Sequence, residues 1–230
     1  MSDLISEVDE ALRQDKAKAV WEKYGKVFIA GAIALVVLTA LYALMSNRQS
    51  AQNQKATAEL LTAMEAENKI TALGTAYENL DGTHAALAGI NAAYAMARGG
   101  KTVEAGRIFD DIANNTAYES VFKDYARLKA VSLDLNQNSP GFDPQKSLTQ
   151  LEKIYENDKS PWRFQARLVG ALIYSGKLDK NQEAISVLKP LTELTAPVPE
   201  TLKTRARNLT KVYEVLSSEK VVTPSRETDG

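Results

Sequence analysis

The chain of 230 residues contains no cysteine and a single histidine, His84. Without cysteine there are no disulfides, no thiolate nucleophiles and no cysteine-based zinc sites. One histidine leaves metal sites that need a histidine pair, and triads that need a histidine beside a nucleophile, without their main candidate. These absences argue against an enzyme, and we expect no catalytic residue, no metal and no cofactor.

An excess of basic residues is also missing, since 28 Lys and Arg stand against 29 Asp and Glu. Proteins that bind nucleic acid neutralise phosphates with clustered basic side chains, so a nucleic-acid partner is not expected. Aromatic residues make up only 7% of the chain, whereas alanine is abundant. A composition rich in alanine and poor in aromatic residues favours closely packed helices.

What the sequence does have is one long apolar run, VFIAGAIALVVLTALYALM, at residues 27–45. A helix of that length, rising 1.5 Å per residue, covers roughly 28 Å and matches the hydrocarbon core of a bilayer. Buried helices of globular proteins seldom run so long without polar residues, and a cleavable signal peptide has a shorter charged region and a shorter apolar core. We therefore predict an uncleaved transmembrane helix in the lipid bilayer.

Basic residues are unevenly distributed around this run. Five precede it, whereas only Arg48 and Lys55 follow within about twenty residues. The positive-inside rule then places the N-terminus in the cytoplasm and the bulk of the chain on the other side. Ala30 and Ala34 form one pair of small residues at four-residue spacing. Such a pair lets a second helix approach closely, which would allow weak homodimerisation through the span.

Residues 1–26 predict a cytoplasmic amphipathic helix. Leu4, Val8 and Leu12 recur at four-residue spacing and form an apolar stripe. Acidic residues come first and basic residues later, which complements the helix dipole. Because such a stripe has no core of its own, it must rest on the membrane surface or on a partner protein, and both alternatives stay open.

Helical patterns separated by short breaks continue through residues 46–220, and no segment alternates as a strand does. The expected fold is all-α: an amphipathic helix and a transmembrane helix, followed by a solenoid of helical hairpins. Residues 221–230 are expected to form a disordered tail. The predicted helices span residues 48–67, 70–80, 84–98, 101–113, 117–135, 144–157, 161–175, 181–195 and 199–217.

Part of this region resembles the tetratricopeptide repeat. Ala105 and Phe109 match the core pair of its second helix, and Asn91 falls at its inward-facing asparagine position. The core pair recurs at Ala184 and Leu188, and more weakly at Ser147 and Leu151 and at Leu73 and Tyr77. Phe109, Leu151 and Leu188 are 42 and 37 residues apart, against the usual repeat length of about 34, so the repeats are degenerate.

The order of the parts carries a second resemblance. The stretch SDLISEVDEALRQDKAKAVWEKYG, then one span, then repeats containing SPWRFQARLVGALIYSGK, resembles the ancillary SecYEG translocon subunits, the YfgM-like proteins. The resemblance covers nearly the whole chain and is strongest before residue 46. It implies a bacterial inner-membrane protein whose periplasmic repeats assist secreted proteins leaving the translocon. The implied partners are SecYEG and periplasmic chaperones or unfolded secreted proteins.

Four side chains of the repeat region deserve a prediction of their own. Asn91 is either a hydrogen-bonded core residue or a ligand-binding residue, and its position in the repeat favours binding. Arg127 and Arg167 fall on helices expected to be the inner members of later hairpins. They hold carboxylates or carbonyls of a bound peptide or are ordinary solvated charges. Trp162, which follows Pro161 at a helix start, is interpreted as a packing anchor between hairpins.

One motif is set aside before a function is predicted. Residues 99–102, GGKT, resemble the end of a phosphate-binding loop, but a helix rather than a strand precedes them, so we expect a turn between helices. The predicted function is a membrane-anchored holdase or chaperone adaptor at the Sec translocon. The alternative is a membrane-tethered scaffold for envelope assembly or cell division, which would use the same surface for one folded partner.

Overall fold

A computed structural model describes residues 38–39, 42–43, 45–137, 141–193 and 198–222. The predicted cytoplasmic helix, and the predicted transmembrane helix except for scattered positions near its end, lie outside these ranges. Within them, no helix is both long enough and apolar enough to cross a membrane. The topology predicted for the N-terminal part of the chain therefore stays a prediction.

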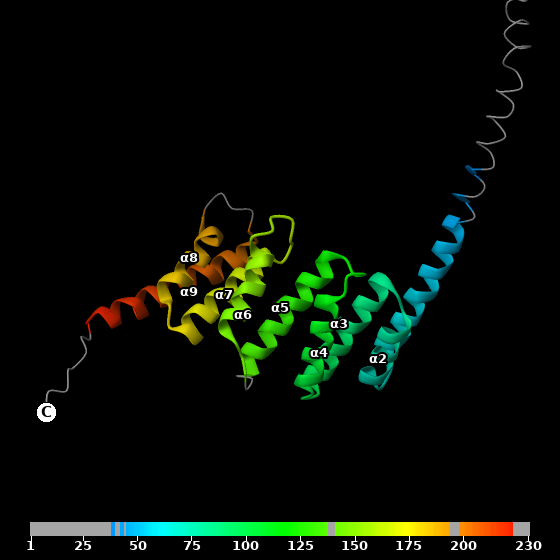
Figure 1. The fold of residues 1–230 in the computed structure, drawn as a ribbon, viewed down its shortest axis with the longest axis horizontal. Helices are drawn as coiled ribbons and strands as arrows, with labels where there is room; N and C mark the ends of the chain where they lie inside the picture. The colour runs from blue at the N-terminus through cyan, green and yellow to red at the C-terminus, as the bar shows by residue number, and fades with distance from the viewer. Residues whose placement is uncertain (1–37, 40–41, 44, 138–140, 194–197, 223–230) are drawn as a thin grey trace, which may run out of the picture. The chain divides into compact units, whose positions relative to one another are not determined.

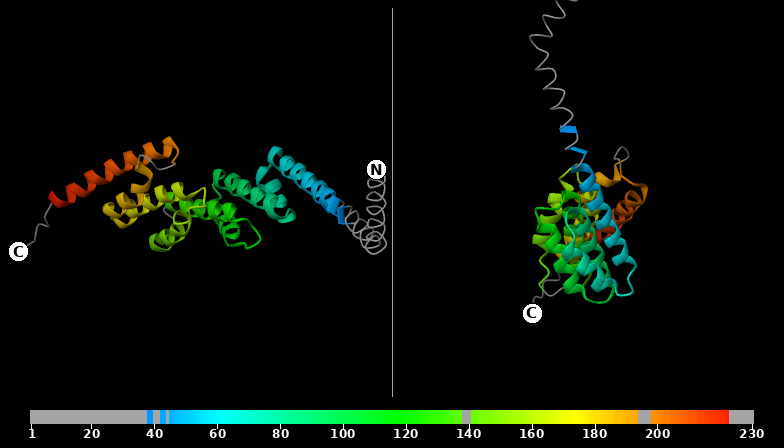
Figure 2. Two further views of the ribbon diagram at one scale, coloured as in Figure 1. Left: turned by 90° about the horizontal axis from the view of Figure 1, so that it is seen from above. Right: turned by 90° about the vertical axis from the view of Figure 1, so that its right-hand side faces the viewer.

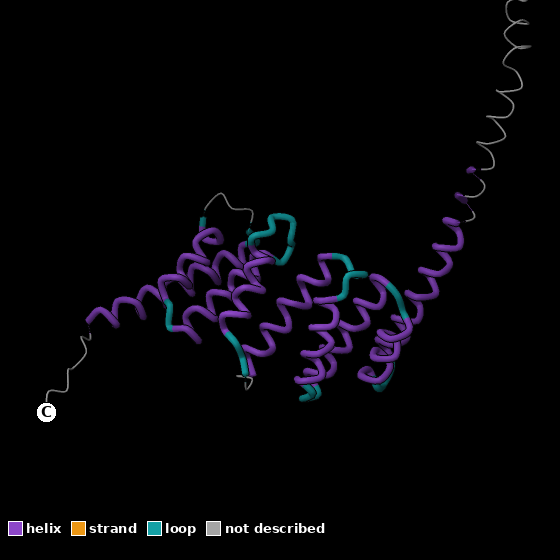
Figure 3. The backbone as a smooth tube through the Cα atoms, viewed as in Figure 1, coloured by secondary structure: helices purple, strands orange, loops and turns teal. Residues whose placement is uncertain are grey.

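The chain divides into two compact units, Met1–Thr57 and Ala58–Gly230. In the first unit, residues 45–57 are helical. The second unit begins with helical residues 58–65, and its described residues contain helices and loops but no strand, as Figure 3 shows. Its further helices, labelled in Figure 1, are α2 (Lys69–Asn79), α3 (Gly82–Arg98), α4 (Thr102–Asn114), α5 (Ser120–Gln137), α6 (Pro144–Tyr155), α7 (Arg163–Leu178), α8 (Asn181–Thr192) and α9 (Glu200–Val222).

The all-helical fold is thus confirmed, and most predicted helix ends shift by three residues or fewer. The helix expected from residue 117 begins at Ser120, because the Asn115 side chain accepts a hydrogen bond from the backbone N–H of Ala117 and holds a turn there. The last helix ends at Val222 rather than at 217 and includes the start of the predicted tail. Residues 200–223 contain no proline or glycine, so no stop signal marks position 217.

The helices of the second unit form two layers. Each packs mainly on the helices that precede and follow it in the chain. In addition, α3 touches α5, α5 touches α7 and α7 touches α9, whereas the described even-numbered helices make no such contacts with one another. The odd-numbered helices therefore form one layer, and each of α4, α6 and α8 bridges two of its members (Figure 1 and Figure 2).

Three clusters of buried side chains lie between the layers. The first is shared by α3, α4 and α5, the second by α5, α6 and α7, and the third by α7, α8 and α9. Phe109, Leu151 and Leu188, the second members of the predicted core pairs, each belong to a different cluster and are at most 2% exposed. These three core positions, taken from the resemblance to tetratricopeptide repeats, are therefore confirmed as buried, whereas Tyr77, from the weaker pair with Leu73, is only half-buried.

A regular repeat exists in the odd layer, although it is not 34 residues long. Ala126, Ala166 and Ala206 follow one another at intervals of 40 residues on α5, α7 and α9, and each is fully buried in its own cluster. Alanine leaves room for the neighbouring helix to approach closely. The core pairs compared with the tetratricopeptide repeat at Phe109, Leu151 and Leu188 lie on the even helices. Their spacing departs from 40 residues because the connections on either side of these helices differ in length.

Candidate binding face

Two grooves open along the odd layer, and both are lined by residues at helical spacing. On α5, the second groove takes Tyr125, Lys129, Ser132 and Asn136, which follow one another at intervals of four, three and four residues. This spacing places all four side chains on one side of the helix. We call the surface made up of the linings of both grooves the groove face.

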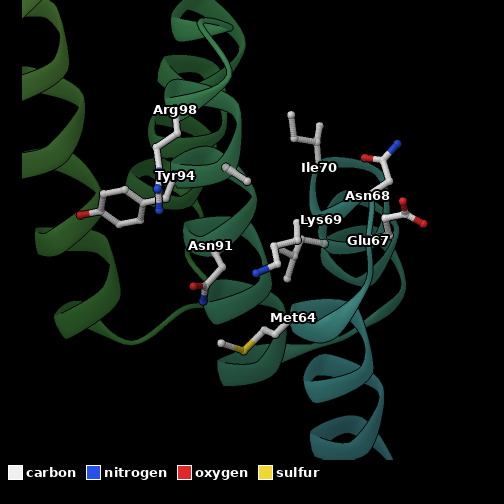
Figure 4. A pocket seen from close by; sticks show the side chains of 10 residues that line it. Met64, Glu67, Asn68, Lys69, Ile70, Asn91, Tyr94 and Arg98 are labelled. Carbon is white, nitrogen blue, oxygen red and sulfur yellow. The ribbon is translucent and has the colours of Figure 1, made fainter.

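The first groove lies between α3 and the segment that precedes and begins α2, and its volume is about 840 Å³. Figure 4 shows Asn91, Tyr94 and Arg98 on the α3 side and Met64, Lys69 and Ile70 on the other. The lining combines apolar, basic, acidic and amide side chains. It consists of Met64, Glu67, Asn68, Lys69, Ile70, Leu73, Asn91, Tyr94, Ala95 and Arg98.

Asn91 is hydrogen-bonded within the protein and also lines the first groove. Its Nδ2 donates to the carbonyl oxygen of Leu87 one turn earlier, at 2.8 Å. The side chain is half-buried and lines the first groove. The internal bond uses one amide proton and orients the rest of the amide, so the hydrogen-bonded alternative is shown, while binding of a ligand stays a prediction.

The second groove crosses three odd helices, and its volume is about 410 Å³. It is lined mostly by apolar side chains, with Lys129 and Arg205 as the charged members. Its aromatic wall is Trp162, whose indole Nε1 donates to the backbone oxygen of Val121 at 2.9 Å. The full lining is Tyr125, Leu128, Lys129, Ser132, Leu135, Asn136, Trp162, Gln165, Leu168, Val169, Leu172, Leu202 and Arg205.

Trp162 is the anchor that the sequence predicted, and it is also part of the groove. Its ring lies 4.5 Å from that of Tyr125, measured between centroids, so it packs the start of α7 onto α5. The hydrogen bond to Val121 fixes the indole to the first turn of α5. A packing role and a lining role are therefore compatible in this side chain.

A pair of tyrosines joins the two grooves. The hydroxyl oxygens of Tyr94, from the first groove, and Tyr125, from the second, lie 2.6 Å apart and share a hydrogen bond. The Lys129 ammonium stands over both rings, 5.8 Å from the centroid of Tyr94 and 5.2 Å from that of Tyr125. Burial and the bond to Tyr94 raise the pKa of Tyr125 to about 12, although Lys129 lowers it, so the hydroxyl stays protonated at neutral pH.

Arg127 and Arg167 lie outside the lining of both grooves and play matching roles within the protein. Nη2 of Arg127 donates to the carbonyl oxygen of Ala113 in the last turn of α4, at 3.0 Å, and Nη1 lies 3.4 Å from the Asp124 carboxylate. Nη2 of Arg167 lies 3.4 Å from the carbonyl oxygen of Tyr155, the last residue of α6. Each arginine therefore caps the C-terminal end of the preceding even helix.

Arg167 has two further contacts. Its guanidinium lies 4.6 Å from the centroid of the Tyr155 ring, and Nη2 is 3.9 Å from the Glu156 carboxylate. The structure thus shows what holds these two arginines, while a role in binding a peptide stays a prediction for them.

Sequence reasoning missed Lys129 and Arg205, the charged residues of the second groove. A signal for them was present, because Tyr125, Gln165 and Arg205 occupy the same position of the 40-residue repeat and all three line the groove. The buried alanines Ala126, Ala166 and Ala206 directly follow these three residues and mark the same position of the repeat. Comparing the odd helices at this interval would have pointed to the correct side of each helix.

Two other predictions can be placed. Gly99 and Gly100 form the turn between α3 and α4, and Gly100 has a φ of 79°, a conformation that glycine adopts readily. The GGKT stretch is therefore a turn between helices, as predicted. No group of three or more His, Cys, Asp or Glu in the part of the chain that the structure describes is placed to hold a metal ion.

Comparison with known proteins gives one match. Residues 1–213 match the model of a family described as "Protein of unknown function (DUF2659)". No curated protein and no solved structure matches the chain. Because that description does not mention the translocon, the resemblance to the YfgM-like subunits stays a prediction.

Proposed function

We infer the function from the chain's own surfaces, because the chain belongs to this family, whose description is that of a protein of unknown function. We propose that it is a membrane-anchored protein-binding module at the Sec translocon. In this proposal, residues 1–45 hold the chain at the bacterial inner membrane with the N-terminus in the cytoplasm. The repeats bind secreted or envelope proteins, or the chaperones that accompany them, in the periplasm. The chain acts as a holdase or chaperone adaptor.

The observation that carries the proposal is the groove face. Its grooves cross α3, α5, α7 and α9, so a segment lying along it contacts side chains from successive helices. Apolar surface, hydrogen-bonding amides and basic groups alternate there, as in sites that hold segments of other proteins. Repeat proteins use such continuous surfaces for partners rather than for chemistry.

The location rests on the N-terminal sequence. The apolar run at residues 27–45 has the length of a membrane span, and the basic residues before it favour a cytoplasmic N-terminus. The resemblance of the first 45 residues to ancillary translocon subunits supplies the expected neighbour, SecYEG. A transmembrane anchor with a protein-binding domain outside it suits capture of chains as they leave an export channel.

A cross-linking experiment tests the proposal. A photoreactive amino acid replaces Ser132, which lines the second groove, or Thr149, an exposed residue of α6 in the other layer, as the matched control. Each full-length variant is reconstituted with SecYEG and a stalled secretory protein. We expect a cross-link to the stalled protein from position 132 and none from position 149. Equal yields would contradict a role of the groove face.

Exchange of residues 1–46 for an unrelated anchor of the same orientation separates location from binding. Co-purification with SecYEG should be lost, while cross-linking of peptides at position 132 should persist. If co-purification survives the exchange and position 132 cross-links one folded protein instead of secretory chains, the scaffold function is the better conclusion.

A further inference from the structure

The charges of the second groove indicate which protein segments it selects. Lys129 and Arg205 line it from α5 and α9, and no Asp or Glu is among its lining residues. Neither cation has a carboxylate within ion-pair distance in the ranges that the structure describes. The groove therefore has positive charge that the rest of the described structure does not neutralise.

Two other basic side chains of these helices do have acidic partners. Arg127 pairs with Asp124, and Arg207 lies 3.5 Å from Glu200. In the groove, no such carboxylate stands beside Lys129 or Arg205. Since the whole chain has a net charge of −1, the positive charge is local to this surface.

One hydrogen-bond acceptor in the groove is also unused. Oε1 of Gln165 is buried and accepts no hydrogen bond from any residue that the structure describes. Gln165 lies in the middle of the lining, on α7 between the helices that bear Lys129 and Arg205. A buried amide oxygen without a donor is costly, and a backbone N–H of a bound segment would satisfy it.

Most of the remaining lining is apolar, and exposed apolar side chains continue along α9. Leu168, Val169 and Leu172 of α7 face the groove with Leu202 of α9. Val212 and Leu216 follow Arg205 by seven and eleven residues, so they lie on the same side of α9, and they are 52% and 39% exposed. A ligand that fills the groove meets leucine and valine side chains of α7 and α9, and one that extends beyond Arg205 along α9 meets further apolar surface.

We propose that the second groove binds a segment of a partner protein in which apolar side chains flank a carboxylate. The carboxylate lies between Lys129 and Arg205, a backbone N–H of the segment donates to Oε1 of Gln165, and the apolar side chains cover Val169, Leu172 and Leu202. This inference rests on the proposed function and adds a selection rule: apolar segments with acidic residues are retained, and those with basic residues are disfavoured.

The test uses the full-length chain in lipid nanodiscs of zwitterionic lipid, with empty nanodiscs as the blank. Three short fluorescent peptides have leucines on either side of one central residue, which is aspartate, asparagine or lysine. We expect the aspartate peptide to bind about fivefold more tightly than the asparagine peptide, and the lysine peptide to bind most weakly. The preference for aspartate should shrink as salt is raised, because these groups are partly exposed.

Variants locate the preference. Lys129→Gln and Arg205→Gln should each reduce the difference between the aspartate and asparagine peptides, and together they should abolish it. Lys153→Gln and Lys189→Gln, which remove exposed lysines of α6 and α8, should leave it unchanged. Asparagine-peptide affinity should stay within about twofold of the parent value in all five variants, the double variant included, which shows that the groove remains folded.

Different failures have different meanings. If aspartate and asparagine peptides bind equally well to the parent chain, the charge selection is wrong, although the leucine-dependent binding still supports a protein-binding groove. If the preference persists in the double variant, the carboxylate binds elsewhere and the inference is overturned. If none of the peptides binds, both the inference and the proposed function fail.

Discussion

The hydroxyl groups of Tyr94 and Tyr125 meet at 2.6 Å across the junction of α3 and α5, and this bond joins the two grooves into one surface. Tyr94 also packs edge to face on Phe109 of α4, with ring centroids 5.8 Å apart. Tyr125 in turn lies against Trp162 at the start of α7. Aromatic side chains thus connect successive helix pairs at the junction of the two grooves.

The tyrosine pair should stabilise the fold measurably. Tyr94→Phe and Tyr125→Phe each remove one partner of the shared hydrogen bond, and we expect each to lower the free energy of unfolding by about 1 kcal/mol. The double variant should cost less than the sum of the two, because both changes remove the same bond. Chemical denaturation of the four proteins gives this comparison, and strict additivity would show that the two hydroxyls do not stabilise each other.

Tyr125 should also make stability depend on alkaline pH. Its folded-state pKa of about 12 lies above the ordinary value near 10, so the folded protein holds this proton where the unfolded chain has lost it. The resulting stabilisation is complete below pH 10 and is lost as the pH rises from 10 towards 12. Tyr155 has a pKa raised to about 12 by burial and adds to the effect.

Removing the titrating group isolates its share of this dependence. Tyr125→Phe should therefore reduce the slope of the denaturation midpoint against pH between pH 10 and 11. An unchanged slope in Tyr125→Phe would show that the raised pKa does not contribute.

Two glycines of neighbouring helices should respond to alanine in opposite directions. A Cβ added at Gly89 of α3 would stand 2.7 Å from the Tyr77 ring and 2.9 Å from Cδ1 of Ile112, so Gly89→Ala should destabilise by about 1–3 kcal/mol. Gly106 of α4 has nothing within 4 Å of that position, so Gly106→Ala should stabilise by about 0.5–1 kcal/mol through helix propensity. Thermal melts followed by circular dichroism check both, and a stabilised Gly89→Ala would refute the close packing.

Arg127 and Arg167 should matter for stability. Arg127→Gln removes a charged donor from the end of α4, and we expect a loss of about 1–2 kcal/mol in the free energy of unfolding. Arg167→Gln should cost somewhat less, because its hydrogen bond is longer. Arg107→Gln, at an exposed position of α4, is the control and should change stability by less than about 0.5 kcal/mol. Weakened peptide binding with unchanged stability would instead support the role predicted from the sequence.

The topology can be tested directly because the chain has no cysteine. Single cysteines replacing Ser2 and Ser217 should differ in their reaction with a membrane-impermeant maleimide applied from the periplasmic side. We expect labelling at position 217 and none at position 2 until the membrane is permeabilised. Labelling at position 2 alone would reverse the proposed orientation.

Much of the fold follows from local pattern. Phe109, Leu151 and Leu188 were placed in the core from the resemblance to the tetratricopeptide repeat, and they lie there because an amphipathic helix has only one face to bury. Helix ends were found where glycine, proline or asparagine interrupts that spacing, as at Gly99 and Gly100. Where no such residue occurs, as at the end of α9, no local signal favours one end position over another.

The candidate site depended more on tertiary structure. Asn91 could be singled out because an amide stands on an otherwise apolar helix, and the structure places it in the first groove. Arg127 and Lys129 are two residues apart on one helix, and their charges alone do not distinguish them. Helical geometry points them in different directions, and the packing of α4 and α7 on α5 decides that Arg127 caps a helix end while Lys129 lines a groove.

By itself, the sequence determined the helices, their order, the core positions and a membrane-length apolar run, because each of these is written in the spacing of neighbouring residues. Only the tertiary structure decided which layer each helix joins and which side of it remains open. That choice depends on contacts between residues some 40 positions apart, such as the ring contact of Tyr125 with Trp162 and the hydrogen bond from Trp162 to Val121. Such contacts arise from the packing of whole helices, which no local pattern specifies.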